Sequence, residues 1–202
     1  MIRSFLFDMG NVLVHFSHDR MCQQMGLLCG RSGDDIRRLL LDSGVQWNFE
    51  RGLMTAEDFH RRFQDIVAKN VDFNELIQAA SDIFELNREI VPVLDALKKN
   101  GHRLVLLSNT SIWHFEFIKK RFDVLDRFDR FVVSYEVGAI KPEPTIFEKA
   151  LEVIHCVPQE CFYTDDIPMY VEAGRKYGLD AEVFTDVDRL KRQLQVRRVK
   201  LG

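Results

Sequence analysis

The chain of 202 residues is long enough for one domain with a large insertion or for two small domains. A hydrophobic share of 46% is ordinary for a globular protein, and a formal net charge of −3 argues against general binding to nucleic acid or anionic membranes. There is no membrane-length apolar stretch, no signal peptide and no close CxxC pair among the four cysteines, so we expect a cytoplasmic protein with free thiols.

The first predicted element is a short apolar strand at residues 2–7, which ends at Asp8 and a Gly-Asn turn. Apolar residues on both faces are typical of a strand inside a parallel sheet. Asp8 then stands at the carboxyl end of the strand, where open α/β sheets bind ligands. This placement makes Asp8 a candidate for chemistry, the alternative being an acid that merely caps the turn.

Residues 18–84 follow a helical pattern that no strand pattern interrupts. Thr55 and Asp72 each begin a capping motif, with an acidic residue three positions later. Apolar residues after both caps repeat at helical spacing and predict two amphipathic helices. A shorter helix is expected around residues 36–40, and the whole stretch is interpreted as a small helical bundle.

The remainder of the chain alternates strands with single helices, which implies right-handed crossovers and a doubly wound parallel sheet. The predicted strands cover residues 103–107, 131–134, 161–164 and 181–184, and the predicted helices cover 87–100, 112–122, 144–154 and 168–177, before a last basic helix. The expected fold class is therefore α/β. Residues 1–16 plus 87–202 would form the core, and residues 17–86 would form a cap inserted after the first strand.

Polar side chains follow the carboxyl ends of the predicted strands: Asp8, Ser108, Asn109, Lys141, Asp165 and Asp166. In a parallel sheet these ends meet at one edge, so one crevice would hold carboxylates, a hydroxyl and an ammonium group. Facing carboxylates repel unless a cation separates them, and a site of oxygen ligands favours Mg²⁺. Lys141 would add positive charge for an anionic substrate.

Four motifs resemble those of the haloacid dehalogenase superfamily of aspartate-nucleophile hydrolases, and the resemblance covers nearly the whole chain. They are FDMGNV at 7–12, LSN at 107–109, KPEP at 141–144 and YTDD at 163–166 with EAG at 172–174. The insertion lies where the first subclass of the family carries its helical cap. The resemblance implies a Rossmann-like three-layer core, a Mg²⁺ cofactor and a small phosphorylated metabolite as substrate. It leaves open whether the protein is a monomer or a homodimer.

The resemblance also implies roles for the acidic residues. Asp8 would be the nucleophile that takes the phosphoryl group. Asp8, Asp166 and the backbone carbonyl of Gly10 would bind Mg²⁺. Asp165 would lie outside the ligand set and orient Lys141 or a metal-bound water.

The remaining roles concern the substrate. Ser108 and the backbone N–H of Asn109 would bind phosphoryl oxygens, and Lys141 would neutralise the transferring group, so that Asp8, Ser108 and Lys141 form the catalytic set. Trp47 and Glu50 are expected in a loop between cap helices. An aromatic ring and a carboxylate there would suit a sugar, and both residues are candidate substrate contacts.

One position departs from the phosphatase pattern. Two residues after the nucleophile, where phosphatases of this family usually carry an Asp as general acid and base, the chain has Gly10. The expected function is removal of phosphate from a sugar phosphate, as in the Asp-x-Gly-Asn-Val branch that includes glucose-1-phosphate phosphatases. The acid would then come from the cap, water or substrate, with His15 as the nearest candidate. A 2-haloacid dehalogenase and a catalytically weak or inactive binding module are the alternatives.

Overall fold

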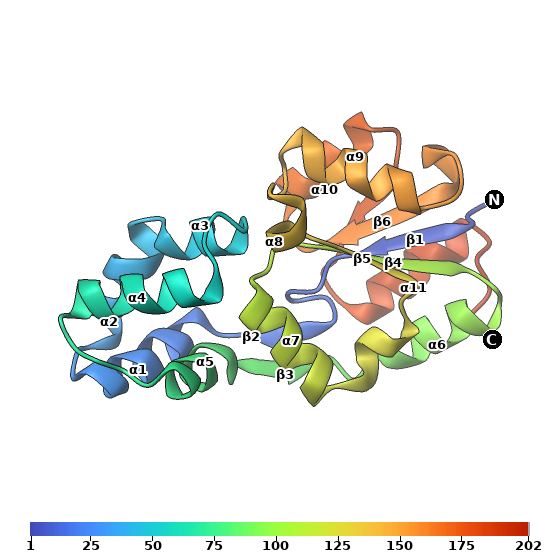
Figure 1. Ribbon diagram of the computed structural model, residues 1–202. Coiled ribbons are helices and arrows are strands. Elements are labelled where there is room, and N and C mark those ends of the chain that lie inside the picture. The colour runs from blue at the N-terminus through green and yellow to red at the C-terminus, as the bar shows by residue number, and fades with distance from the viewer. Residues whose placement is uncertain (202) are drawn as a thin grey trace.

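A five-stranded parallel sheet with the order β5-β4-β1-β6-β7 forms the centre of the core (Figure 1). The computed structural model describes residues 1–201, and Gly202, the last residue of the expected core segment, lies outside the described residues. The strands are β1 (Ser4–Phe7), β4 (Arg103–Ser108), β5 (Arg130–Val133), β6 (Cys161–Asp165) and β7 (Asp180–Val183). The expected α/β fold with a parallel sheet is confirmed.

Helices cover both faces of the sheet and make the three layers (Figure 1). Successive residues of a strand point to opposite faces, so Phe5 and Phe7 pack on one side of β1 and Leu6 on the other. The first side is covered by α6 (Val91–Lys99), α7 (Ile112–Arg121) and α11 (Val187–Val196), and the second by α9 (Pro144–Val153) and α10 (Pro168–Lys176). Short turns of helix at η2 (Asp123–Arg127), α8 (Ser134–Val137) and η3 (Pro158–Glu160) complete the connections.

The position of β1 between β4 and β6 explains why the polar residues at the strand ends lie close together. All four of its residues are buried, and Phe7 is paired with Leu106 on one side and Thr164 on the other. Asp8 therefore leaves the sheet beside the ends of β4 and β6. The register alone brings three polar strand ends to one edge.

Residues 18–81 form a helical insertion with its own hydrophobic core (Figure 1). Its helices are α1 (His18–Cys29), α2 (Gly33–Arg37), η1 (Arg38–Asp42, a π-helix), α3 (Val45–Glu50), α4 (Ala56–Val67) and α5 (Phe73–Ser81). The predicted caps are present: Thr55 and Asp58 form a reciprocal capping box, and Asp72 accepts from two backbone N–H groups. None of the helices in residues 1–201 is long and apolar enough to cross a membrane.

A two-stranded antiparallel ribbon joins the insertion to the sheet. It consists of β2 (Val14–Phe16) and β3 (Phe84–Leu86), which sequence analysis did not predict, because three residues are too few to show an alternating pattern. Asn87 fixes the ribbon to the chain after β1, since its backbone N–H donates to the carbonyl of Leu13 at 3.0 Å and its Nδ2 to the carbonyl of Val12 at 2.9 Å. The next helix consequently begins at Val91 rather than at the predicted residue 87.

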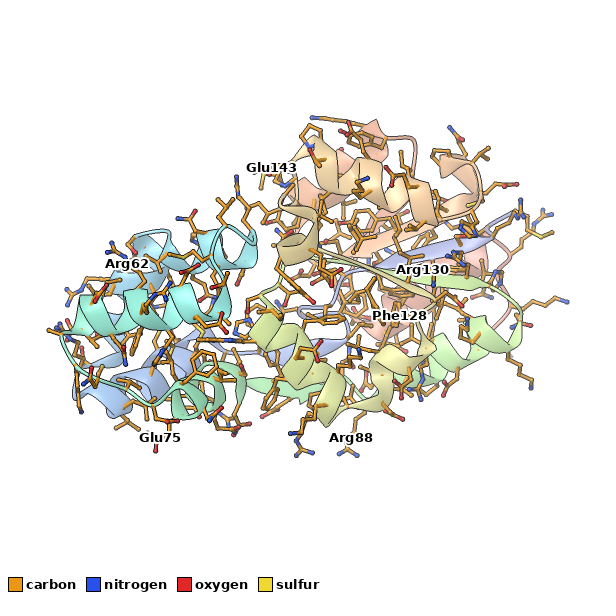
Figure 2. The ribbon with its side chains drawn as sticks, viewed as in Figure 1. Arg62, Glu75, Arg88, Phe128, Arg130 and Glu143 are labelled. Carbon is orange, nitrogen blue, oxygen red and sulfur yellow. The ribbon has the colours of Figure 1, made fainter. Side chains whose placement is uncertain are left out.

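Two contacts besides the ribbon hold the insertion against the core. Trp113 of α7 is buried in the insertion's hydrophobic core, with its ring centroid 5.0 Å from that of Phe49 and 5.1 Å from that of Phe59. Glu143, labelled at the junction in Figure 2, forms an ion pair with Arg51 at 2.5 Å. The insertion is thus held over the carboxyl edge of the sheet from two directions.

Candidate active site

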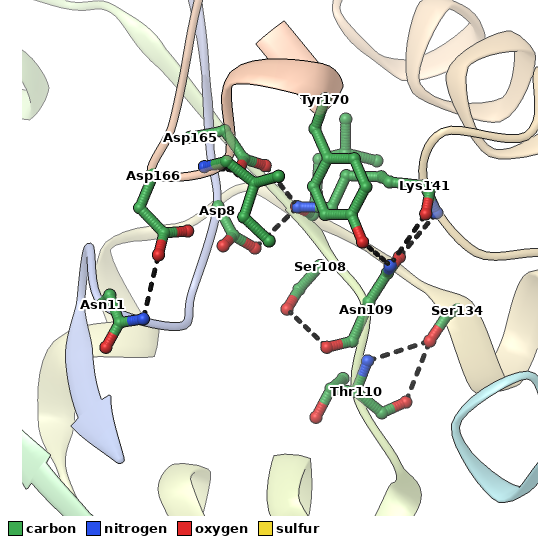
Figure 3. A network of polar contacts seen from close by, with 12 residues as sticks. Asp8, Asn11, Ser108, Asn109, Thr110, Ser134, Lys141, Asp165, Asp166 and Tyr170 are labelled. Carbon is green, nitrogen blue, oxygen red and sulfur yellow. Dashed lines mark hydrogen bonds and ion pairs between the residues drawn. The ribbon is translucent and has the colours of Figure 1, made fainter. Parts of the chain in front are cut away.

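Lys141 lies between two carboxylates at the carboxyl edge of the sheet (Figure 3). Its Nζ donates to Asp8 Oδ1 at 2.7 Å, to Asp165 Oδ2 at 2.6 Å and to the carbonyl of Leu107 at 3.0 Å. These three bonds use every proton of the ammonium group. Lys141 is 1% exposed, so water cannot replace any of them.

Asp165 is fully occupied in holding that lysine. Its Oδ2 also accepts from the hydroxyl of Tyr163 at 2.6 Å, and its Oδ1 accepts from the backbone N–H of Ile167 at 2.9 Å. Oxygens of Asp8, Asp165 and Asp166 lie within 4.8 Å of one another, close enough to share a cation. Because both oxygens of Asp165 already accept hydrogen bonds, Asp8 and Asp166 are the carboxylates of this group that have acceptor capacity left for a metal.

The buried charges shift the protonation of the site. Burial raises the pKa of Asp8 to about 7, although Lys141 opposes the shift, and burial also raises the pKa of Asp166. Burial acts to lower the pKa of Lys141, but the two carboxylates outweigh it and raise that pKa above its ordinary value. The lysine therefore stays charged, whereas the positive charge near Asp8 and Asp166 is too small to offset the cost of burying their carboxylates.

The side chain of Asn109 holds the main chain of Lys141 in place. The side-chain Oδ1 of Asn109 accepts from the backbone N–H of Lys141 at 2.7 Å, and its Nδ2 donates to the Lys141 carbonyl at 3.1 Å. The sequence motif predicted a role only for the backbone N–H of Asn109, and not this paired side-chain contact. Ser108 is 1% exposed and its hydroxyl has a single long contact of 3.5 Å, so it is free to donate to a ligand.

A cavity of about 210 Å³ opens in front of Asp8, between the sheet edge and the insertion. Its volume is below the ~300–1,000 Å³ of typical ligand pockets and suits a small metabolite. The predicted residues Asp8, Gly10, Trp47, Glu50, Ser108, Asn109, Lys141 and Asp166 all line it. Aromatic and histidine side chains that sequence analysis did not identify line it as well: Phe16, His18, Phe84, His114 and Tyr170. Their spacing is that of ordinary core residues, so no sequence signal distinguished them.

Three expectations about residues near the site need correction. Trp47 and Glu50 lie in the helix α3, not in a loop, because the glycines on either side bound a six-residue helix too short to show a period. His15 lies outside the cavity: it is exposed, points to the other side of β2 and lines a separate groove. The alternation of a strand places its neighbour Phe16 in the cavity instead.

Gly10 and Phe16 share one space. A Cβ atom at position 10 would lie 2.9 Å from Cε1 of Phe16, closer than real Cβ contacts allow. The aromatic ring therefore fills the volume that a side chain at position 10 would need. Gly10 keeps its backbone carbonyl, which remains a possible metal ligand.

Glu50 presents the insertion's carboxylate to the cavity. It is 6% exposed, and its Oε1 accepts one hydrogen bond from Nε2 of Gln46 at 3.0 Å. Burial raises its pKa to about 7, with the Gln46 hydrogen bond opposing the shift. Trp47 is 42% exposed at the mouth, and its indole N–H donates to the carbonyl of Leu41 at 3.1 Å.

Comparisons with known proteins agree with this arrangement. The chain is 26% identical over 187 residues to the D-ribitol-5-phosphate phosphatase of Bacteroides thetaiotaomicron, which covers 89% of this chain and 90% of that protein. It is 34% identical over 186 residues to the phosphoglycolate phosphatase of Aquifex aeolicus, covering 88% of this chain and 82% of that protein.

Solved structures share the fold. A haloacid dehalogenase family enzyme of Bacteroides thetaiotaomicron, in complex with magnesium and inorganic phosphate, matches with a TM-score of 0.84 and 24% identity, over 94% of this chain and 99% of that chain. The L-2-haloacid dehalogenase of Xanthobacter autotrophicus matches with a TM-score of 0.65 and 15% identity, over 97% and 83% of the two chains. The family model described as haloacid dehalogenase-like hydrolase matches residues 2–178. The expected family is thereby confirmed, and the chain belongs to the haloacid dehalogenase-like hydrolases.

Proposed function

We propose that the protein is a Mg²⁺-dependent phosphohydrolase that removes phosphate from a sugar or alditol monophosphate through an aspartyl-phosphate on Asp8. The observation that carries the proposal is the buried Lys141, bonded to Asp8 at 2.7 Å and to Asp165 at 2.6 Å at the floor of the cavity. This arrangement places a carboxylate nucleophile beside a fixed positive charge. Both groups face a space that holds a small molecule.

The residues present fit a magnesium ion. Asp8 and Asp166 have pKa values that burial raises, which is the condition that a divalent cation relieves. Both carboxylates and the Gly10 carbonyl are the hard oxygen donors that Mg²⁺ prefers. The Asn11 side chain donates to Asp166 Oδ2 at 2.9 Å and orients it (Figure 3). When bound, the ion would stabilise charge on the phosphoryl oxygens.

The chain's own residues then account for phosphoryl transfer. The free oxygen of Asp8 attacks phosphorus, and the bond from phosphorus to the leaving oxygen breaks. Ser108 donates a hydrogen bond to a phosphoryl oxygen, and Lys141 balances the negative charge of the group in transfer. Water then attacks the acyl phosphate and regenerates Asp8.

The charges in the cavity favour a neutral leaving group. Among the described residues that line it, Lys141 is the sole permanent cation, because burial lowers the pKa of His18 and brings that of His114 to about 4. Glu50 adds a carboxylate on the opposite wall. A second anionic group on the substrate would meet no partner there. A polyol phosphate, such as the substrate named for the Bacteroides relative, fits better than a phosphorylated acid.

We propose further that residues 17–86 act as a cap that selects this substrate, since Trp47 and Glu50 face the phosphate site from it.

We also propose a cytoplasmic location, because the four free cysteines suit a reducing compartment.

The test is turnover of 4-nitrophenyl phosphate and a panel of sugar and alditol monophosphates, with and without Mg²⁺, by the wild-type protein and by Asp8→Asn. We expect Mg²⁺-dependent activity in the wild type and none in Asp8→Asn, with equal thermal stability checked in the same buffer. Activity that persists in Asp8→Asn would refute the nucleophile. Metal-independent halide release from 2-haloacids would support the dehalogenase reaction. A folded protein that hydrolyses none of the substrates would support a binding module.

A further inference from the structure

The loop after β1 cannot supply the proton that an alkyl leaving oxygen needs. Gly10 has no side chain, and the Phe16 ring fills the neighbouring space at 2.9 Å from the position of a Cβ atom. General acid catalysis is typically worth about 10²–10⁴-fold in rate. A phosphohydrolase built on this site would therefore need a proton carrier from another wall of the cavity.

Most ionisable groups in the cavity are committed elsewhere. The ones that share it with Glu50 are His18 from α1, His114 from α7, Asp8, Lys141, Asp166 and Tyr170. Nε2 of His114 is hydrogen-bonded to the carbonyl of Ala80 at 3.1 Å. Burial lowers the pKa of both histidines, which disfavours the charged imidazolium that could act as the acid, and the N–H of His114 is already given to the Ala80 carbonyl. Burial also raises the pKa of Tyr170, which makes it a weak acid. Asp8, Lys141 and Asp166 belong to the phosphate and metal centre.

Glu50 has the properties that the others lack. Glu50 as a whole is 6% exposed, and no salt bridge joins its carboxylate to a cation in residues 1–201. Its one hydrogen bond comes from Gln46 on its own helix. With a pKa of about 7, it exchanges a proton readily at neutral pH, which suits a group that first donates and later accepts.

The main chain of Glu50 is tied to the core rather than only to the insertion. The hydroxyl of Ser134, at the start of α8, donates to the Glu50 carbonyl at 2.5 Å. The same hydroxyl accepts from the backbone N–H of Thr110, two residues after Ser108. The ion pair between Arg51 and Glu143 secures the next residue. These contacts hold the backbone of residue 50 against the core segment that follows Ser108, and the hydrogen bond from Gln46 orients the carboxyl group.

We propose that Glu50 is the general acid and base that replaces the missing side chain at position 10; this proposal rests on the proposed phosphohydrolase function. In the first step the bond from phosphorus to the leaving oxygen breaks as Asp8 bonds to phosphorus, and the Glu50 carboxyl proton passes to that oxygen, giving the alcohol. In the second step the water oxygen bonds to phosphorus as the bond from phosphorus to the Asp8 oxygen breaks, and the Glu50 carboxylate takes a proton from that water. The carboxyl group is thereby restored, and inorganic phosphate leaves.

The decisive variant is Glu50→Gln, which keeps the shape and a hydrogen bond to Gln46 but cannot transfer the proton. The first step is measured in pre-steady-state experiments with excess substrate, on 4-nitrophenyl phosphate, whose leaving group needs no proton, and on the alkyl phosphate that the wild type hydrolyses fastest. We expect a rate on the alkyl phosphate lower by about 10²-fold or more. We expect the burst of nitrophenolate to keep its wild-type rate, followed by slow turnover.

Equal losses on both substrates, or no loss on either, would overturn the proposal. Asp8→Asn separates it from the proposed function, because that variant should abolish the nitrophenolate burst as well. A second variant, Gln46→Met, removes the donor that stabilises the charged carboxylate. The alkaline limb of the alkyl phosphate rate should move to higher pH in Gln46→Met, and a limb that does not move would refute Glu50 as the titrating acid.

Discussion

Lys141 Nζ and Asp165 Oδ2 lie 2.6 Å apart, in a pair that is almost completely removed from solvent. Asp165 receives two further hydrogen bonds, and Lys141 gives its remaining protons to Asp8 and to a backbone carbonyl. The pair is therefore the fixed element of the site, and the lysine is positioned before any ligand binds. Such preorganisation is what electrostatic stabilisation of a phosphoryl group requires.

Removing the lysine should damage both folding and activity. Lys141→Met leaves Asp8 and Asp165 facing one another in a buried space, and breaking a buried ion pair costs about 3–5 kcal/mol. We expect a loss of that size in urea unfolding at pH 7, together with loss of turnover. The loss should shrink as the pH falls, because protonation of Asp8 ends its repulsion with Asp165. A variant as stable as the wild type at pH 7 would contradict the assigned role of the ion pair.

The residues of this pair show what sequence can and cannot reveal. Asp8, Lys141 and Asp165 were predicted together because apolar runs on both faces identify parallel strands, and parallel strand ends meet at one edge. The ribbon carrying Phe16 was not predicted, because its strands have three residues each. The helix that contains Glu50 was not predicted either, because its six residues are too few to show a helical period. Short elements are determined by tertiary contacts, such as the Asn87 hydrogen bonds, and not by periodicity.

Metal binding should reverse the pH dependence of stability at Asp8. The folded-state pKa of about 7 is raised above the unfolded value near 4, so the metal-free protein gains stability from this group at low pH and loses it as the pH rises through 7. Mg²⁺ binds the deprotonated form, and at a hundredfold excess over its Kd it should add about 2.7 kcal/mol. Thermal unfolding from pH 5 to pH 8 should therefore show a Mg²⁺ shift that grows with pH.

Asp166→Asn is the matched control for this measurement, because it removes one carboxylate of the metal pair and leaves the Lys141 contacts in place. Its thermal unfolding should respond to Mg²⁺ much less than that of the wild type. An undiminished response would place the ion elsewhere.

The contact between positions 10 and 16 should appear as an energetic coupling. Gly10→Ala forces a Cβ atom to within 2.9 Å of the Phe16 ring, and overpacking of this kind costs about 1–3 kcal/mol. Phe16→Ala removes the obstacle, so the loss caused by Gly10→Ala should be smaller in the double variant. A double-mutant cycle in urea would measure a coupling of about 0.5–3 kcal/mol. Strictly additive effects would show that the ring moves aside freely.

Trp113 should stabilise the insertion and the core together. The indole is 6% exposed among the aromatic rings of the insertion although it belongs to α7 of the core. Trp113→Ala should cost about 3–5 kcal/mol, and Trp113→Phe should cost less because it retains part of the packing. Both are read from denaturant unfolding. Loss of a single cooperative transition in Trp113→Ala would show that the insertion can unfold separately.

The close fit of Phe16 against Gly10 also limits how the site can be redesigned. An acid placed at position 10 would meet the ring, and removal of the ring alone would open a gap beside the nucleophile. A side chain at position 10 therefore requires a smaller residue at position 16 in the same variant.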